Sequence, residues 1–124
     1  MPVRVGAAAA LSALLWLAPA QAQQCPKPDP AVQAEEEKAC RDTGGHWARF
    51  GVRDHLCGIY SCAPRTADGG KPCRNHADCE YLCLAKGEPR VGAPATGQCA
   101  AIRSEFGCRY HVNGGVVAGR VCVD

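Results

Sequence analysis

The sequence predicts a small disulfide-rich α+β fold that is loop-rich, with one N-terminal helix, short antiparallel strands and a C-terminal β-hairpin. Ten of the 124 residues are cysteine, a density typical of small disulfide scaffolds. A helix start signal near the N-terminus and an Asn-Gly turn near the C-terminus supply the helix and the hairpin. The predicted organisation is a secretory signal peptide (residues 1–22), an extended proline-rich arm (residues 23–30) and a single disulfide-rich domain (residues 31–124).

The signal peptide is predicted from its charge, its apolar run and its cleavage site. Arg4 supplies a positive charge, residues 5–17 are almost entirely apolar, and Ala20-Gln21-Ala22 is a small-x-small cleavage site. The apolar run is too short for a permanent membrane anchor. We therefore expect cleavage after Ala22, a periplasmic or secreted protein, and no integral membrane segment after cleavage.

Export places the cysteines in an oxidising compartment, where an even number of thiols is expected to pair completely. We expect five disulfides and no free thiol. The cysteines concerned are Cys25, Cys40, Cys57, Cys62, Cys73, Cys79, Cys83, Cys99, Cys108 and Cys122. The formal net charge of +2 includes Arg4 of the signal, so the remaining chain is nearly neutral and gives no electrostatic reason to bind nucleic acid.

The helix is predicted over residues 31–42. Asp29 is a suitable N-cap and Pro30 fits the first helical position. The acidic residues lie toward the front of this segment and the basic ones toward its end, which suits the helix dipole. Gly44-Gly45 is expected to end the helix.

Three strands are predicted from alternation and turn signals. A short strand surrounds Trp47, where polar and apolar residues alternate up to Phe50. We expect at least one of these two aromatic residues in the core, and the alternative is that Trp47 is a surface residue that binds a partner. The hairpin strands are residues 108–112 and 116–123, on either side of Asn113-Gly114-Gly115.

The middle of the chain is predicted to be loop-rich. Between Cys57 and Cys83 the cysteines are too closely spaced for long strands. Residues 86–97 are rich in glycine and proline and are expected to form an open loop. Arg90 of this loop is a candidate binding residue that could enter a protease-like pocket, and the alternative is a plain connector.

Two groups of residues suggest metal chemistry. Cys73, His76, Cys79 and Cys83 have a spacing that would suggest zinc in a cytosolic protein. In an oxidising compartment the thiols are expected to form disulfides instead. We therefore expect no bound metal and no cofactor.

The second group resembles the active site of secreted phospholipase A2. Cys57-Gly58 resembles the start of the calcium loop of that family, and residues 73–79 resemble its cysteine and histidine motif. The resemblance implies that His76 would activate water. However, Ala77 stands where the family has its calcium-binding carboxylate, and Asp78 is one place late. Without that carboxylate a calcium ion loses a charged ligand, so the resemblance implies a degenerate enzyme at most.

The chain from Cys40 onward also resembles small exported cysteine-rich proteins of proteobacteria that remain uncharacterised. The matching residues are Cys40, Gly44-Gly45, Trp47, Gly51, Cys57, Asp68, Gly70-Lys71, Cys73-x5-Cys79-x3-Cys83, Gly97-x-Cys99, Phe106-Gly107-Cys108 and Cys122-x-Asp124. This resemblance implies export and disulfides, and it implies no activity. The family pattern uses eight cysteines and leaves out Cys25 and Cys62, which implies a Cys25–Cys62 bridge. The rival pairing is a local Cys57–Cys62 loop.

These observations predict a non-enzymatic binding or inhibitory module. No serine or histidine lies in a recognised nucleophile motif, and a small core leaves little room for an enclosed pocket. Trp47 and Arg90 are the candidate binding residues, and the expected partner is a protein or an envelope ligand. The alternatives are a structural envelope protein without a discrete ligand and the degenerate phospholipase A2-like enzyme.

Overall fold

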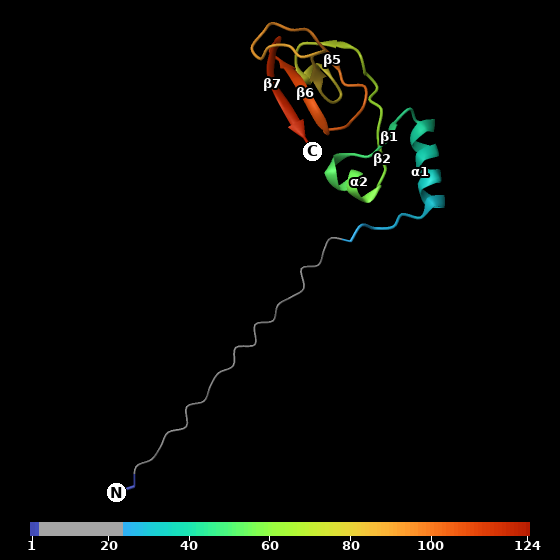
Figure 1. Ribbon diagram of the computed structural model, residues 1–124. Coiled ribbons are helices and arrows are strands. Elements are labelled where there is room, and N and C mark those ends of the chain that lie inside the picture. Colours follow the sequence, from blue (N-terminus) through green and yellow to red (C-terminus); the bar gives the residue numbers. More distant parts are fainter. Residues whose placement is uncertain (3–23) are drawn as a thin grey trace.

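Figure 1 shows the computed structural model of the chain, which describes residues 1–2 and 24–124. The predicted signal peptide and its cleavage site after Ala22 lie outside the described residues, apart from Met1 and Pro2. Among the helices that the structure describes, none is long and apolar enough to cross a membrane. The described chain has the small disulfide-rich α+β fold that the sequence predicts, with two antiparallel sheets and five disulfides.

The first part of the fold, which we call the N-terminal lobe, comprises residues 24–63. Its elements are α1 (Pro30–Asp42), β1 (His46–Ala48), α2 (Gly51–Cys57) and β2 (Ser61–Ala63). The predicted helix start is confirmed, because Pro30 is the first helical residue and the Asp29 carboxylate accepts a hydrogen bond from the backbone N–H of Ala31 at 2.8 Å. The predicted short strand around Trp47 is also confirmed, and it pairs with β2 in antiparallel fashion.

The sequence predicts one helix, and the structure contains a second one, α2. It has only seven residues and begins with a glycine, so it is too short to show a helical repeat in the sequence. Local contacts hold its two ends. The Asp54 carboxylate accepts a hydrogen bond from the backbone N–H of Phe50 at 3.0 Å, and Gly58 ends the helix in the left-handed region with a φ of 65°.

The second part, the C-terminal lobe of residues 64–124, is built on a five-stranded antiparallel sheet. Its elements are β3 (Pro72–Cys73), the 3₁₀-helix His76–Asp78, β4 (Cys83–Leu84), β5 (Gly97–Cys99), β6 (Gly107–Asn113) and β7 (Val116–Val123). The strand order is β3-β5-β4-β6-β7. The predicted C-terminal hairpin is confirmed as β6 and β7, and the short strands between the middle cysteines fit the predicted loop-rich segment.

The core consists of disulfides and small apolar side chains. Cys73, Cys83, Cys99 and Val112 form its centre and are each at most 3% exposed. Trp47 and Phe50 are only half-buried, so the prediction that at least one of them lies in the core is wrong. Both residues belong to the N-terminal lobe of residues 24–63, in which only Cys40 and Ala63 are buried. Two short helices and a two-stranded sheet enclose little volume, so this lobe has no interior for a large ring.

Every cysteine forms a disulfide, as predicted. The bridges are Cys25–Cys57, Cys40–Cys62, Cys73–Cys83, Cys79–Cys99 and Cys108–Cys122. The predicted Cys25–Cys62 bridge is therefore wrong, and so is the rival Cys57–Cys62. The end of α1 packs against β2, which brings Cys40 to Cys62, and the N-terminal arm reaches the end of α2 at Cys57.

Gly45 explains why α1 can approach β2 so closely. A side-chain carbon at this position would lie 2.7 Å from the sulfur of Cys62 and 2.8 Å from the sulfur of Cys40. Contacts this short do not occur between real atoms, so any larger residue would push the bridge apart. The Gly44-Gly45 pair thus ends the helix and also makes space for the bridge that anchors it.

Within residues 24–124, no disulfide joins the two lobes. The segment 64–67, which follows β2 directly, anchors the start of the C-terminal lobe, because it runs antiparallel to residues 100–103 of the same lobe. Thr66 is 3% exposed, its backbone N–H donates to Ala101, and its hydroxyl donates to the carbonyl of Ala100. The backbone N–H of Arg103 returns a hydrogen bond to the carbonyl of Pro64 at 2.8 Å. The backbone at residues 63–64 is therefore the covalent link between the lobes in the described chain, and these hydrogen bonds fix its C-terminal side.

A disulfide in the core and a disulfide on an exposed arm are expected to differ in how much they contribute to the free energy of unfolding. Cys79–Cys99 packs in the core of the C-terminal lobe, whereas Cys25–Cys57 ties an exposed arm to α2. Loop length alone would favour the second bridge, because it spans 32 residues and the first only 20. We expect burial to dominate. Replacing both members of Cys79–Cys99 by alanine is expected to cost about 4–5 kcal/mol, and the same change in Cys25–Cys57 about 2 kcal/mol.

Urea unfolding of the two double-alanine variants measures this difference, after peptide mass spectrometry has confirmed that the other four bridges are native in each. An equal or larger loss of stability for the Cys25–Cys57 variant would show that loop closure, and not core packing, governs the stability of this fold.

Candidate functional site

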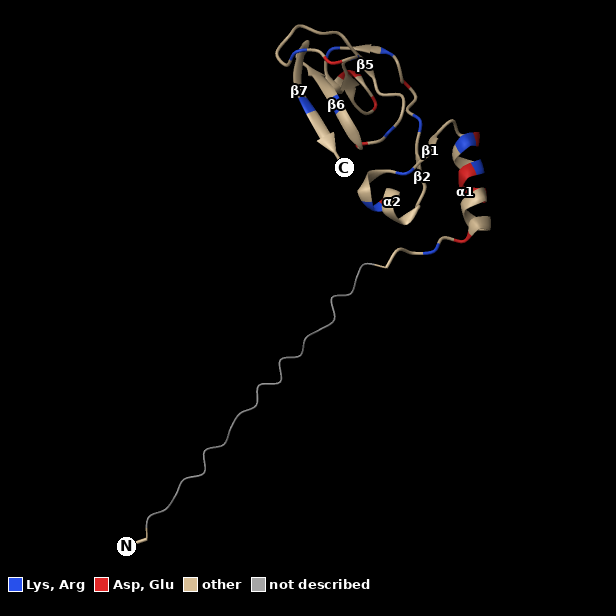
Figure 2. Cartoon of the chain, viewed as in Figure 1, with Lys and Arg blue, Asp and Glu red and all other residues tan. Residues whose placement is uncertain are grey.

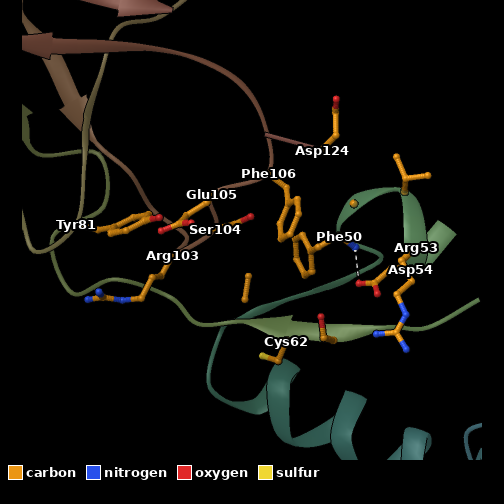
Figure 3. Close-up of a pocket in the computed structure, with 14 residues that line it drawn as sticks. Phe50, Arg53, Asp54, Cys62, Tyr81, Arg103, Ser104, Glu105, Phe106 and Asp124 are labelled. Atoms are coloured by element: carbon orange, nitrogen blue, oxygen red, sulfur yellow. Dashed lines mark hydrogen bonds between the residues drawn. The ribbon is translucent and has the colours of Figure 1, made fainter. Parts of the chain in front are cut away.

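A groove lies between the two lobes. One wall is α2 with the residue before it, and the other is formed by residues 102–106 and by the end of the β6–β7 hairpin that lies away from its turn. The groove consists of two adjoining hollows of about 740 Å³ and about 770 Å³, which share Phe50, Gly51, Phe106 and Asp124. Figure 3 shows the first hollow, with side chains of both lobes facing one another across it.

Two aromatic rings meet in the middle of the groove. Phe50 stacks on Phe106 with ring centroids 5.8 Å apart, so each lobe contributes one ring (Figure 3). Gly51 permits this contact, because a side-chain carbon there would lie 2.9 Å from the ring of Phe106. Its φ of 80° also lies in the left-handed region that favours glycine. The aromatic pair is therefore both an inter-lobe contact and part of the surface of the groove.

The rim of the groove exposes large apolar side chains. Val52 is 60% exposed and Leu56 is 79% exposed, and both line the second hollow together with the half-exposed Phe106. Val52 and Leu56 are four residues apart in α2, so they lie on one face of that helix. Exposed apolar groups that gather in one place are typical of binding surfaces, whereas scattered ones are ordinary.

Polar groups surround this apolar centre. Arg53 lies on the α2 wall, and Asp124 and Ser104, the latter only 8% exposed, lie on the opposite wall. Tyr81 and Glu105 complete that wall in Figure 3. Burial raises the pKa of Tyr81, with Glu105 acting in the same direction, so its phenol stays neutral at physiological pH. The groove can thus take an apolar group at its centre and polar groups around it.

Trp47, a predicted binding residue, does not line this groove. It lies on the opposite face of the β1–β2 pair, where it stacks on Tyr60 with ring centroids 6.3 Å apart. The guanidinium of Arg49 lies 5.2 Å from the centre of the Tyr60 ring. This half-buried stack borders a separate shallow hollow next to α1.

Arg90, the other predicted binding residue, is exposed in the C-terminal lobe and is not brought near Trp47. Its loop is not open, which corrects the prediction for residues 86–97. Gly92 and Ala93 exchange backbone hydrogen bonds with Val117 of β7. The carbonyl of Arg90 accepts a hydrogen bond from the backbone N–H of Ala93, which closes a tight turn. An inhibitor loop must present the carbonyl of its key residue to an oxyanion hole, and here that carbonyl already has a partner.

The histidine that resembles a phospholipase base lies in the 3₁₀-helix. The Nε2 atom of His76 is buried and has no hydrogen-bond partner among the described residues. Asp78 caps this helix, since its carboxylate accepts hydrogen bonds from the backbone N–H groups of Arg74 and Asn75. These two bonds lower the pKa of Asp78. The carboxylate is therefore used structurally.

The suspected zinc ligands are divided between two disulfides. Cys73 is bonded to Cys83 and Cys79 to Cys99, although the sulfur atoms of Cys73, Cys79 and Cys99 lie within 4.8 Å of one another. Oxidised sulfur is not a thiolate, so these atoms hold the core together in place of a metal ion. The closeness of the two bridges is the structural reason for the short cysteine spacing.

Sequence reasoning identified Phe50 as an aromatic residue of interest but missed the other apolar groups of the groove. The i, i+4 pair Val52 and Leu56 was the available signal, and it was hidden because the segment is only seven residues long. Phe106 belongs to the family pattern, but the pattern did not reveal its place in the groove, because that place depends on contact with a residue more than fifty positions away. Comparison with protein-family models, with curated proteins and with solved structures finds no match for this chain.

A histidine pair beside the sheet is expected to make stability depend on pH. The rings of His76 and His111 lie with centroids 5.1 Å apart. Burial lowers the pKa of His111, and the nearby His76 and Arg109 act in the same direction. The unfolded chain therefore binds more protons than the folded one once the pH falls through about 6.5, and the folded state loses stability there.

Replacing His111 by glutamine is expected to reduce the loss of folding free energy between neutral and acidic pH. The free energy of unfolding, measured with urea at about pH 7.5 and about pH 5, tests it. The substitution His55→Gln, at an exposed position of α2, is the matched control. If the His111→Gln variant keeps the full difference between the two pH values, burial of this imidazole does not matter for stability.

Proposed function

We propose that this protein is a non-enzymatic binding module that binds another protein through the groove between its lobes. The observation that carries the proposal is the exposed apolar face of α2. Leu56 and Val52 stand in solvent beside Phe106, with no apolar group of the described chain covering them. Burying such side chains in a partner contributes about 25 cal/mol per Å² of apolar surface removed from water.

The walls of the groove are held in place before any partner binds. Cys25–Cys57 closes the end of α2, and Cys108–Cys122 joins the two strands at the hairpin end. Because disulfides restrict both walls, little conformational freedom remains to be lost on binding. This favours a recognition surface over a structural protein without a discrete ligand.

The groove also favours binding over catalysis. Its centre is formed by two stacked phenyl rings, which offer no group for acid–base chemistry. Five disulfides are typical of proteins that fold in an oxidising compartment. We place the module in the periplasm or outside the cell, where its partner would be another exported protein.

Photo-crosslinking in the cells that produce the protein tests the proposal. A photoreactive phenylalanine analogue at position 56 is expected to give one dominant crosslinked protein. The same analogue at position 32 is the control, because Val32 is a 50% exposed residue of α1 away from the groove. The substitution Leu56→Asp is expected to weaken binding of the purified crosslinked protein at least tenfold, or about 1.4 kcal/mol, since it places a charge in an apolar contact.

The variant Val32→Asp controls for the added charge and is expected to bind normally. Equal crosslinking from both positions, or normal binding by the Leu56→Asp variant, would show that the groove is not the binding site. In that case the structural envelope protein would become the better interpretation.

A further inference from the structure

The outer edge of the five-stranded sheet has free backbone groups. β7 is the last strand of the sheet, so one side of it faces no other strand. The carbonyl of Tyr110 accepts a hydrogen bond from the chain after β4, so this group points away from β7. Tyr110 pairs with Arg120, which makes Arg120 part of a non-hydrogen-bonded pair whose own N–H and C=O point outward. The N–H and C=O groups of Cys122, two residues further along β7, also point outward.

Part of this edge already accepts an added strand. Gly92 and Ala93 form backbone hydrogen bonds with Val117 at the start of β7, and Pro94 forms a bridge with Val116. These contacts cover only the start of the strand. Among the described residues, none donates to or accepts from the outward groups of Arg120 and Cys122. The edge is therefore compatible with strand addition, and its second half is left open.

One face of this open half carries an apolar hollow. Val121 and Val123 lie on the same face of β7, as alternate residues of a strand do. They line a hollow of about 240 Å³ together with Tyr81, Leu82 and His111, and the charged residues Glu105 and Arg109 also border it. Val121 is 46% exposed. β7 then ends beside α2, because Val123 and Asp124 also line the groove.

The other face carries the only charge of the strand. Arg120 is the single ionisable residue of β7, and it appears as one blue band on that strand in Figure 2. Its guanidinium lies 6.0 Å from the centre of the Tyr110 ring, on the face opposite Val121. A strand laid beside β7 would therefore meet the side chains of Val121 and Val123 on one face and the guanidinium of Arg120 on the other.

We propose that the partner presents an extended segment that adds to the open half of β7 as a further antiparallel strand, with apolar side chains at alternate positions and an acidic side chain between them. The apolar side chains lie over Val121, Val123 and the hollow beside them, and the carboxylate pairs with Arg120. Backbone hydrogen bonds supply affinity in this mode and the pockets supply specificity. The inference rests on the proposed binding function, since the edge leads directly into the groove.

Selection from a random seven-residue phage library on the folded protein tests the inference. The selected peptides are expected to alternate apolar and acidic residues, and the best of them, made synthetically, is the probe. N-methylation of the probe one residue at a time is expected to reduce its affinity at least tenfold at every second position only. That alternation arises because only every second N–H of an added strand faces β7.

Two variants of the protein separate the edge from the groove. The substitution Arg120→Pro removes the outward N–H, a change that an edge strand tolerates. It is expected to lower the affinity for the probe peptide at least tenfold. The substitution Val121→Asp leaves the backbone intact and is also expected to lower the affinity for the probe peptide at least tenfold. The matched control is Val91→Asp, because Val91 is 54% exposed in the loop between β4 and β5. Native disulfides and an unchanged urea midpoint are required of each variant.

The outcomes are distinguishable. Peptides that bind Arg120→Pro and Val121→Asp normally but fail on Leu56→Asp would overturn strand addition and leave the groove function standing. A library that yields no peptide would also overturn strand addition. Light scattering could also show that the protein is a dimer and that the Arg120→Pro variant is a monomer. This result would overturn strand addition by a partner, because the edge would then bind a second copy of this chain. Absence of a crosslink from position 56 would instead count against the proposed function.

Discussion

The packing of two disulfides against each other is the constraint on which the rest of the structure depends. Cys73–Cys83 and Cys79–Cys99 place three sulfur atoms within 4.8 Å of one another at the centre of the C-terminal lobe. Together they join β3, β4 and β5 to the 3₁₀-helix, elements of only two or three residues that could not persist by backbone pairing alone. Val112 of the hairpin packs on this cluster and is completely buried.

A core of this kind changes where the large apolar side chains go. The interior of each lobe is formed by cysteines and small apolar residues, and the aromatic residues lie nearer the surface, where Phe50 meets Phe106 and Trp47 meets Tyr60. In a larger domain these rings would form the core and give little surface for binding. Here the covalent bridges supply stability that burial does not, and the apolar side chains of α2 remain available to a partner.

The division of the bridges between the lobes also has a consequence for function. Each lobe is closed by its own disulfides, while the Phe50–Phe106 stack is a non-covalent contact between them. An aromatic contact of this kind contributes far less than a covalent bridge. The groove thus has walls restrained by disulfides and an aromatic contact between them. The open edge of β7 continues one of these walls.

The sequence by itself determined the features that depend on neighbouring residues. The Asp29 cap and Pro30 define the start of α1 because capping acts over a few residues, and Asn113-Gly114 defines the hairpin because the turn fixes the register of its own strands. The complete pairing of ten cysteines follows from their even number and from the oxidising compartment that an export signal implies. Only the tertiary structure decided which cysteines pair, because Cys40 reaches Cys62 through the packing of α1 on β2 and through the space left at Gly45. It also decided that α2 forms, since seven residues are too few to show a helical repeat, and that Phe50 meets Phe106, since this contact joins residues far apart in the chain.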